Sequence, residues 1–220
     1  GKALVQHVID TARSLKARHT IVITGHGADQ VEPALLSANP NDKLQFARQM
    51  PQLETGHAVQ QTVPLLADDA VVVVLSGDVP LTQSDTLFHL IQACGGNKLA
   101  LLTLEQSNPA GYGRIVREGS AVKAVVEHKD ANEDELAIKE INAGIYVFSA
   151  PELRAQLSNL TLDNAQGEKY ITDVIGLLRE AGATVAAVEL LDSWKVEGIN
   201  DRAQLSRVAG LLNGLIVRGW

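Results

Sequence analysis

The chain has 220 residues, of which 45% are hydrophobic and 20% charged, and its net charge is −7. This composition is typical of a folded soluble domain that can bury a sizeable core. The charge is spread along the chain without a basic block, which argues against a nucleic-acid-binding surface. One cysteine, Cys94, excludes an internal disulfide, and no apolar run reaches the roughly 18 residues of a membrane span. We therefore expect a cytoplasmic protein without nucleic-acid or membrane partners.

Helices and strands are predicted to alternate over the first hundred residues. Apolar spacing predicts helices at 4–15, 31–36 and 55–66, the last kinked or ended by Pro64, and a helix from an N-cap at Ser84 to residue 94. Strands are predicted at 20–24, 44–47, 71–75 and 98–104. Such alternation predicts right-handed crossovers and a mostly parallel sheet. The valine run at 71–75 is then a strand buried on both faces, because helices cover both sides of such sheets.

The second half is predicted to contain more strands. Strands at 114–116, 122–126 and 141–148 have little helix between them and indicate a small β-rich insert. Helices at 151–157 and 170–181, a strand at 184–189 and a helix at 201–216 complete the chain. The fold class predicted from the pattern is α/β, with helices on both faces of a mixed, mostly parallel sheet.

Asp78 is the first candidate for chemistry, because it follows the valine strand at the edge where open parallel sheets bind ligands. Gly77 removes side-chain bulk beside it. A carboxylate at this edge suits Mg²⁺, which prefers oxygen ligands and shares phosphate oxygens of substrates. The alternative is an aspartate that caps a turn or helix. Asn200 likewise precedes a predicted helix, where a plain N-cap is the simpler interpretation.

Three further stretches place polar residues near glycines or inside strands. The glycine-rich turn "GYGR" contains Gly113, "VEHKD" contains Glu127, and "EINAG" contains Asn142. Each alone is more often an ordinary surface feature. Zinc-ligand spacing, a G-x-S-x-G elbow and a GxxxxGK[ST] phosphate loop are all missing from the sequence.

Together, the motifs "GHG", "LETGHAVQQ", "GDVPL", "GYGRIVRE", "VVEHKDA", "EINAGIYVF", "NAQGEKYITD" and "VEGINDRAQLSR" occur in an order that closely resembles one family. It is the N-terminal uridyltransferase domain of the bacterial bifunctional N-acetylglucosamine-1-phosphate uridyltransferase/glucosamine-1-phosphate N-acetyltransferase. The resemblance implies a Rossmann-like nucleotide-diphospho-sugar transferase fold. It also implies a Mg²⁺-dependent reaction of UTP with N-acetylglucosamine 1-phosphate. The products are UDP-N-acetylglucosamine, for cell-wall and lipopolysaccharide precursors, and pyrophosphate.

The resemblance also implies site residues. Asp78 and Asn200 would hold Mg²⁺, and Gly77 lies beside Asp78. Residues that would bind the nucleotide or the sugar in the family pattern are Gln49, Thr55, Gly113, Glu127, Asn142, Tyr170 and Thr172.

The chain departs from the family pattern in several places. The family's glycine-rich loop, whose Arg and Lys hold the triphosphate, is not among these residues, so the catalytic residues stay unassigned. The strand before that loop, expected at the centre of the sheet, is also missing. Glu54 replaces a family glycine near the uracil, and Ala143 replaces a frequent threonine. We expect a fragment with weak activity of its own.

Residues 1–199 are expected to form the nucleotidyltransferase domain. Residues 200–220 are expected to form a helix that leads to the family's acetyltransferase β-helix, which makes the parent protein a homotrimer. Two alternatives stay open at this point: a non-catalytic UDP-sugar-binding remnant, and a pyrophosphorylase for another sugar 1-phosphate.

Overall fold

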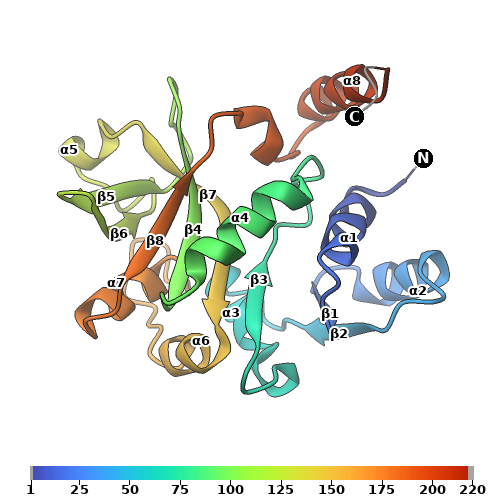
Figure 1. The fold of residues 1–220 in the computed structure, drawn as a ribbon, viewed down its shortest axis with the longest axis horizontal. Coiled ribbons are helices and arrows are strands. Elements are labelled where there is room, and N and C mark those ends of the chain that lie inside the picture. Colours follow the sequence, from blue (N-terminus) through green and yellow to red (C-terminus); the bar gives the residue numbers. More distant parts are fainter. Residues whose placement is uncertain (1, 218–220) are drawn as a thin grey trace.

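The computed structural model describes residues 2–217 as a mixed α/β fold (Figure 1). Its helices are α1 (Leu4–Ser14), α2 (Ala28–Ala38), α3 (Glu54–Gln60), α4 (Ser84–Cys94), α5 (Glu133–Leu136), α6 (Ala150–Leu157), α7 (Asp173–Glu180) and α8 (Arg202–Val217), with 3-10 turns η1 (Val63–Leu65) and η2 (Ser193–Val196). Its strands are β1 (Thr20–Thr24), β2 (Leu44–Arg48), β3 (Val71–Val74), β4 (Leu99–Glu105), β5 (Arg114–Glu118), β6 (Ala121–Val126), β7 (Glu140–Ser149) and β8 (Val185–Glu189). No helix within the described range is long and apolar enough to cross a membrane.

The sheet is organised around the long strand β7. β7 pairs antiparallel with β4 on one edge and with β3 and β5 on the other, while β8 continues the sheet parallel to β4. Strands β3, β4, β5 and β8 thus run in one direction and β7 in the other. The β5–β6 hairpin is the predicted β-rich insert, and it extends to the left in Figure 1. The predicted fold class is confirmed.

Helices cover both faces of this sheet, and β4 shows how. Leu99 and Leu101 belong to a core that includes the apolar faces of α6 and α7. Ala100 and Leu102, which point the other way because strand side chains alternate, belong to a second core with α4. β4 is therefore buried on both faces, as expected for a strand between two helical layers.

β3 differs from this expectation. Val71 is 58% exposed, and the rest of β3 is only half-buried. The reason is that, among the described residues, β3 pairs with β7 on one edge only, while β1 pairs with β2 in a separate parallel ribbon. The prediction that the valine run is buried on both faces is therefore wrong.

Several predicted boundaries also change. Ser84 is the first residue of α4 rather than its N-cap, a position that Gln83 takes without a side-chain bond. The helix predicted at 55–66 is divided into α3 and the turn η1, which contains Pro64. The helix predicted from Tyr170 begins at Asp173, which leaves Tyr170 in an irregular segment. The division of the chain at residue 199 stays a prediction.

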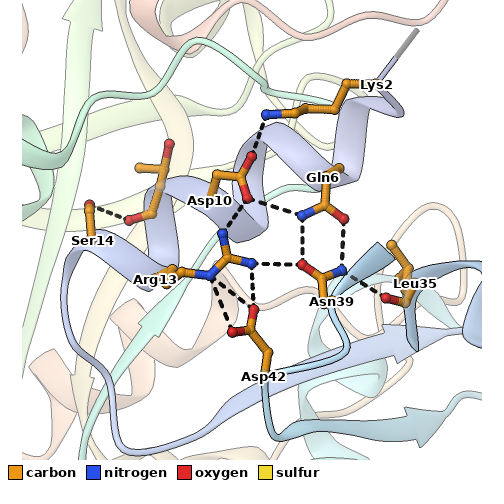
Figure 2. Close-up of polar contacts among 9 residues, drawn as sticks. Lys2, Gln6, Asp10, Arg13, Ser14, Leu35, Asn39 and Asp42 are labelled. Carbon is orange, nitrogen blue, oxygen red and sulfur yellow. Dashed lines mark hydrogen bonds and ion pairs between the residues drawn. The ribbon is translucent and has the colours of Figure 1, made fainter. Parts of the chain in front are cut away.

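A polar network joins α1 to the end of α2 (Figure 2). The buried side-chain amides of Gln6 and Asn39 donate to each other, both at 2.8 Å, and the Asn39 amide also donates to the Leu35 carbonyl at 2.7 Å. Arg13 donates to Asn39 at 2.7 Å and pairs with Asp42. These contacts orient the β1–β2 ribbon, because α2 and the loop before β2 flank it.

Candidate functional site

Polar side chains gather where strand pairing along β7 changes. On one edge of β7, β3 ends opposite Tyr146, and β5 begins opposite Ile141. Between these points two loops meet, residues 76–78 after β3 and residues 111–113 before β5. The backbone N–H of Asn142 donates to the carbonyl of Gly113 at 2.9 Å and holds the second loop against β7. The candidate site therefore lies at the carboxyl end of β3, as the sequence predicts.

Asp78 and Asn200 face the same small space. The backbone N–H of Ile199 donates to the Asp78 carbonyl at 3.1 Å. A Cβ added at Gly198 would lie 3.5 Å from Asp78 Oδ2 and 4.0 Å from Asn200 Nδ2, so both side chains converge above this glycine. The N-cap of α8 is formed by the neighbouring aspartate, whose Oδ1 accepts the N–H of Gln204 at 2.7 Å. The N-cap alternative for Asn200 is therefore wrong.

This corner fits a hard divalent cation. A carboxylate and a carboxamide supply oxygen donors of the kind Mg²⁺ prefers, and the missing side chain of Gly198 keeps the space between them open. Within residues 2–217, no group of three or more His, Cys, Asp or Glu side chains is arranged to hold a metal. A cation at Asp78 and Asn200 would complete its coordination with water or with ligand oxygens, which is usual for Mg²⁺.

Glu127 forms the next part of the site. Its Oε1 accepts the hydroxyl proton of Thr172 at 2.8 Å, and its two carboxylate oxygens lie 3.3 and 3.4 Å from the position of a Cβ added at Gly113. Burial raises the pKa of Glu127, and the nearby carboxylates of Glu54 and Asp173 raise it further, against the bond from Thr172. Gly113 therefore lies directly against a poorly solvated carboxyl group.

Asn142 is fixed by two contacts within β7. Its Nδ2 donates to the Tyr146 hydroxyl at 2.6 Å, and its Oδ1 accepts the N–H of Gly144, a residue in the left-handed region. Burial raises the pKa of Tyr146, so this hydroxyl keeps its proton. Ser76 Oγ lies 3.6 Å from a Cβ added at Gly144, which brings the Asp78 loop next to this turn. Tyr146 was not predicted, although the strand period of two places it on the same face as Asn142.

Gln49 and Thr55 form the far end of the site. Gln49 is 8% exposed, and its Nε2 donates to the carbonyl of Glu54 at 2.9 Å and lies 3.2 Å from His57 Nδ1. The Thr55 hydroxyl accepts the N–H of Ile171 at 3.2 Å, which joins this segment to the one that carries Thr172. Glu54 adopts φ +72°, a left-handed conformation that the sequence indicated only through its replacement of a family glycine.

Tyr170 is buried between these parts. Burial, with the carboxylates of Asp130 and Glu168 nearby, raises its pKa to about 12, so the phenol stays protonated.

Gly77 lies against α1, since a Cβ added there would be 3.6 Å from Val5 Cγ2. Contacts thus link the predicted residues along one rim, from Asn200 and Asp78 through Asn142 and Glu127 to Thr55 and Gln49.

Arg114 is a residue of this region whose role the sequence did not reveal. It is 1% exposed, its guanidinium donates to the Tyr112 carbonyl, and it lies 3.4 Å from His128 Nδ1. These bonds tie the turn that carries Gly113 to the strand it enters. The only signal in the sequence was an arginine directly after a glycine-rich turn.

The family model for nucleotidyl transferases matches residues 1–198, which includes almost the whole rim. The chain belongs to the nucleotidyl transferase family. Among curated relatives, "Bifunctional protein GlmU" of Albidiferax ferrireducens is 52% identical over 209 residues, which cover 94% of this chain and 45% of that protein. The protein of the same name from Herminiimonas arsenicoxydans is 45% identical over 218 residues, 99% of this chain and 47% of its own length. The chain spans slightly under half the length of these relatives.

Solved structures of other nucleotidyl transferases share the fold. A putative glucose-1-phosphate thymidylyltransferase from Bacillus anthracis superposes with a TM-score of 0.72 at 16% identity, covering 94% of this chain and 81% of that one. A UDP-glucose pyrophosphorylase in complex with UDP-glucose superposes with a TM-score of 0.67 at 16% identity, covering 94% and 87%. At these identities the likeness concerns the fold alone.

Proposed function

We propose that the chain is the uridyltransferase part of a bifunctional protein like its GlmU relatives, and that the parent protein makes UDP-N-acetylglucosamine. A phosphate oxygen of N-acetylglucosamine 1-phosphate attacks the α-phosphorus of UTP, and the bond to the β-phosphate breaks to release pyrophosphate. The observation that carries this proposal is identity of 45 to 52% to proteins of that name over 94 to 99% of the chain.

In this proposal, Asp78 and Asn200 hold Mg²⁺. The bound cation would neutralise negative charge on the phosphate oxygens. The chain's own contribution at this corner is to fix the two oxygen donors. The Ile199 N–H anchors the Asp78 backbone, and the cap on α8 sets the position of Asn200. No side chain needs to act as a nucleophile, because the reaction depends mainly on positioning and charge neutralisation.

The sugar is proposed to lie between Gly113, Glu127 and Asn142. The Glu127 carboxylate, oriented by Thr172, accepts hydrogen bonds from sugar hydroxyls, and the missing side chain of Gly113 lets the backbone of its turn lie close to this carboxylate. The Asn142 carboxamide, held by Tyr146, offers a fixed polar contact. Burial of these groups favours discrimination, because a sugar that fails to pair with them leaves them desolvated and unsatisfied.

The uracil and ribose are proposed to lie near Gln49 and Thr55, with Tyr170 between this end and the sugar. The Gln49 amide is already oriented by the Glu54 carbonyl and His57, which prepares it for recognition of a base edge. Glu54 adds a carboxylate beside this end, where the phosphates of a nucleotide are also negative. We infer that Glu54 weakens nucleotide binding.

The curated relatives extend well beyond the matched region. We propose that the full-length protein carries an acetyltransferase domain, forms homotrimers through it, and acts in the cytoplasm in cell-wall precursor synthesis. Its soluble partners are then UTP, N-acetylglucosamine 1-phosphate and UDP-N-acetylglucosamine.

Calorimetric titration of the chain with UDP-N-acetylglucosamine and Mg²⁺ tests the proposal. Asp78→Asn should weaken binding at least about tenfold, because it removes the charge that holds the cation. Glu118→Gln, which neutralises an exposed carboxylate at the end of β5 away from Gly113, should leave binding unchanged.

Three results would contradict parts of the proposal. Equal binding by wild type and Asp78→Asn would remove the metal role of Asp78. Tighter binding of UDP-glucose would favour a pyrophosphorylase for another sugar. Product binding without turnover by the full-length protein would favour a non-catalytic UDP-sugar-binding protein.

A further inference from the structure

Asn200 lies in a short connection, residues 197–201, that joins η2 to α8 and belongs to no helix or strand. Figure 1 shows α8 at the edge of the molecule, apart from the sheet. On the side of the sheet, the connection is held by the Ile199 N–H, which donates to the Asp78 carbonyl at 3.1 Å. Because no helix or strand ladder includes residues 197–201, the direction of the Asn200 side chain depends on such single bonds.

Gln204, in the first turn of α8, supplies the bonds on the other side. Its Oε1 accepts the backbone N–H of Asn200 at 2.5 Å and that of Asp201 at 3.2 Å. In return, the Gln204 N–H donates to Asp201 Oδ1 at 2.7 Å. The bonds between Gln204 and Asp201 form a capping box, the reciprocal arrangement that begins many helices. The bond to Asn200 lies outside that arrangement, because a capping box uses only the N–H of the cap residue.

Three successive backbone N–H groups of the connection are therefore bonded, and Gln204 accepts two of them. Each N–H lies in the plane of its own peptide group, so a bond to it orients that plane. The three bonded planes flank Ile199 and Asn200, and they restrict the backbone dihedral angles of both residues. Those angles set the direction of the Asn200 Cα–Cβ bond, and hence where its carboxamide points.

Arg207, one turn further along α8, supports the same connection. It forms an ion pair with Glu197, which directly precedes Gly198, the glycine between the two proposed metal ligands. Gln204 and Arg207 are three positions apart, so they lie on one face of the helix. The first turns of α8 thus hold the connection at both of its ends. Since Arg207 is exposed, this ion pair contributes less than the bonds from Gln204.

We propose that Gln204 is the positioning residue of this corner, whose side-chain oxygen sets the direction in which Asn200 presents its carboxamide beside Asp78. The inference rests on the metal role proposed above for Asp78 and Asn200. Removal of a residue that orients a metal ligand without touching the metal typically lowers metal affinity by about 10- to 100-fold. We therefore expect Gln204→Ala to bind a divalent cation at least about tenfold more weakly than wild type.

Titration of the chain with Mn²⁺, followed by NMR, tests the inference. Mn²⁺ accepts the same oxygen ligands as Mg²⁺ and broadens the signals of nearby nuclei. In wild type it should broaden both the Asp78 backbone amide and the Asn200 side-chain amide. In Gln204→Ala, broadening of Asp78 should need about tenfold more Mn²⁺, and the Asn200 signal should broaden much less than in wild type at equal occupancy. Gln204→Glu should restore the Asn200 broadening, because its carboxylate keeps the acceptor oxygen.

Two further variants separate positioning from helix stability. Asp201→Ala removes the other half of the capping box and should destabilise α8, but it leaves the Gln204 oxygen able to accept the Asn200 N–H. The Asn200 signal of this variant should therefore still broaden as in wild type. Asn213→Ala, at an exposed position of the same helix, should change neither affinity nor broadening.

The contrary results are distinguishable. If Asp78→Asn leaves Mn²⁺ binding unchanged, the proposed metal role is wrong and this inference is wrong with it. If Asp78→Asn weakens binding while Gln204→Ala binds and broadens like wild type, only the positioning role is wrong. Equal losses in Gln204→Ala and Asp201→Ala would show that Gln204 acts only through the stability of α8, which also overturns the inference.

Discussion

Gly113→Ala tests whether the turn before β5 is as tightly packed as the structure indicates. The added Cβ would lie 2.9 Å from Val125 Cγ1, closer than carbon atoms pack, and 3.3 and 3.4 Å from the Glu127 carboxylate oxygens. The backbone cannot move away easily, because the Gly113 carbonyl accepts the N–H of Asn142 and the next residue, Arg114, is buried. Val125, itself buried in the core, must shift instead.

Overpacking of this kind costs about 1–3 kcal/mol. For a protein of this size, each kcal/mol lowers the melting temperature by about 2–4 °C. Thermal unfolding followed by circular dichroism should show this loss in Gly113→Ala. Gly176→Ala is the matched control, since a Cβ there meets nothing within 4 Å in the interior of α7. That change should stabilise the protein by about 0.5–1 kcal/mol, because alanine is the better helix former.

The same variant should also weaken binding of UDP-N-acetylglucosamine, because the new methyl group would displace the Glu127 carboxylate that is proposed to bind the sugar. A Gly113→Ala protein that melts within about 1 °C of wild type and binds the ligand equally well would refute the reasoning. Reduced stability with unchanged binding would leave the packing argument intact and remove the sugar role of Gly113.

Three other changes give separate tests. Asn39→Ala should cost about 1–3 kcal/mol in urea unfolding, because it removes both buried hydrogen bonds between Asn39 and Gln6 and leaves the Gln6 carbonyl oxygen without its donor. Asn41→Ala on the exposed loop should cost little, and equal effects would contradict the network. The folded-state pKa of Glu127 is raised, so its stabilising contribution is present below the ordinary glutamate pKa of about 4.3 and is lost as pH rises through the raised value. As pH rises, the melting temperature of wild type should therefore fall relative to that of Glu127→Gln. Parallel melting curves over this pH range would contradict the expectation. Glu54→Gly should relieve a left-handed conformation and stabilise the protein by up to about 1 kcal/mol. It should also lower the pKa of Glu127, which NMR would detect as a downward shift of that residue's titration. An unchanged titration would show that the two carboxylates do not interact.

Sequence reasoning identified much of the fold because the relevant signals are local. The helical spacing of α1 and the continuous apolar run of β4 each reflect the environment of their own residues, and both elements are found where predicted, within a residue or two. Asp78 was predicted at a sheet edge from its position directly after an apolar strand, and the structure has it there. The resemblance of the ordered motifs then pointed to the family that residues 1–198 match.

Only the tertiary structure decided which side chains meet. Thr172 reaches Glu127 across 45 positions of sequence, and Ile171 reaches Thr55 across 116, distances at which periodicity carries no information. The left-handed Glu54 depends on the same long-range packing, because the segment that follows it is held against residues 169–171.

The valine-rich strand β3 shows the same division between local and long-range information. The sequence determined that residues 71–74 form an apolar strand, since β-branched side chains suit a pleated backbone. It could not determine that β3 pairs along one edge only within residues 2–217, because the identity of a strand's neighbours depends on the whole sheet. Local side-chain chemistry thus fixed the element, and long-range backbone pairing decided how much of it is buried.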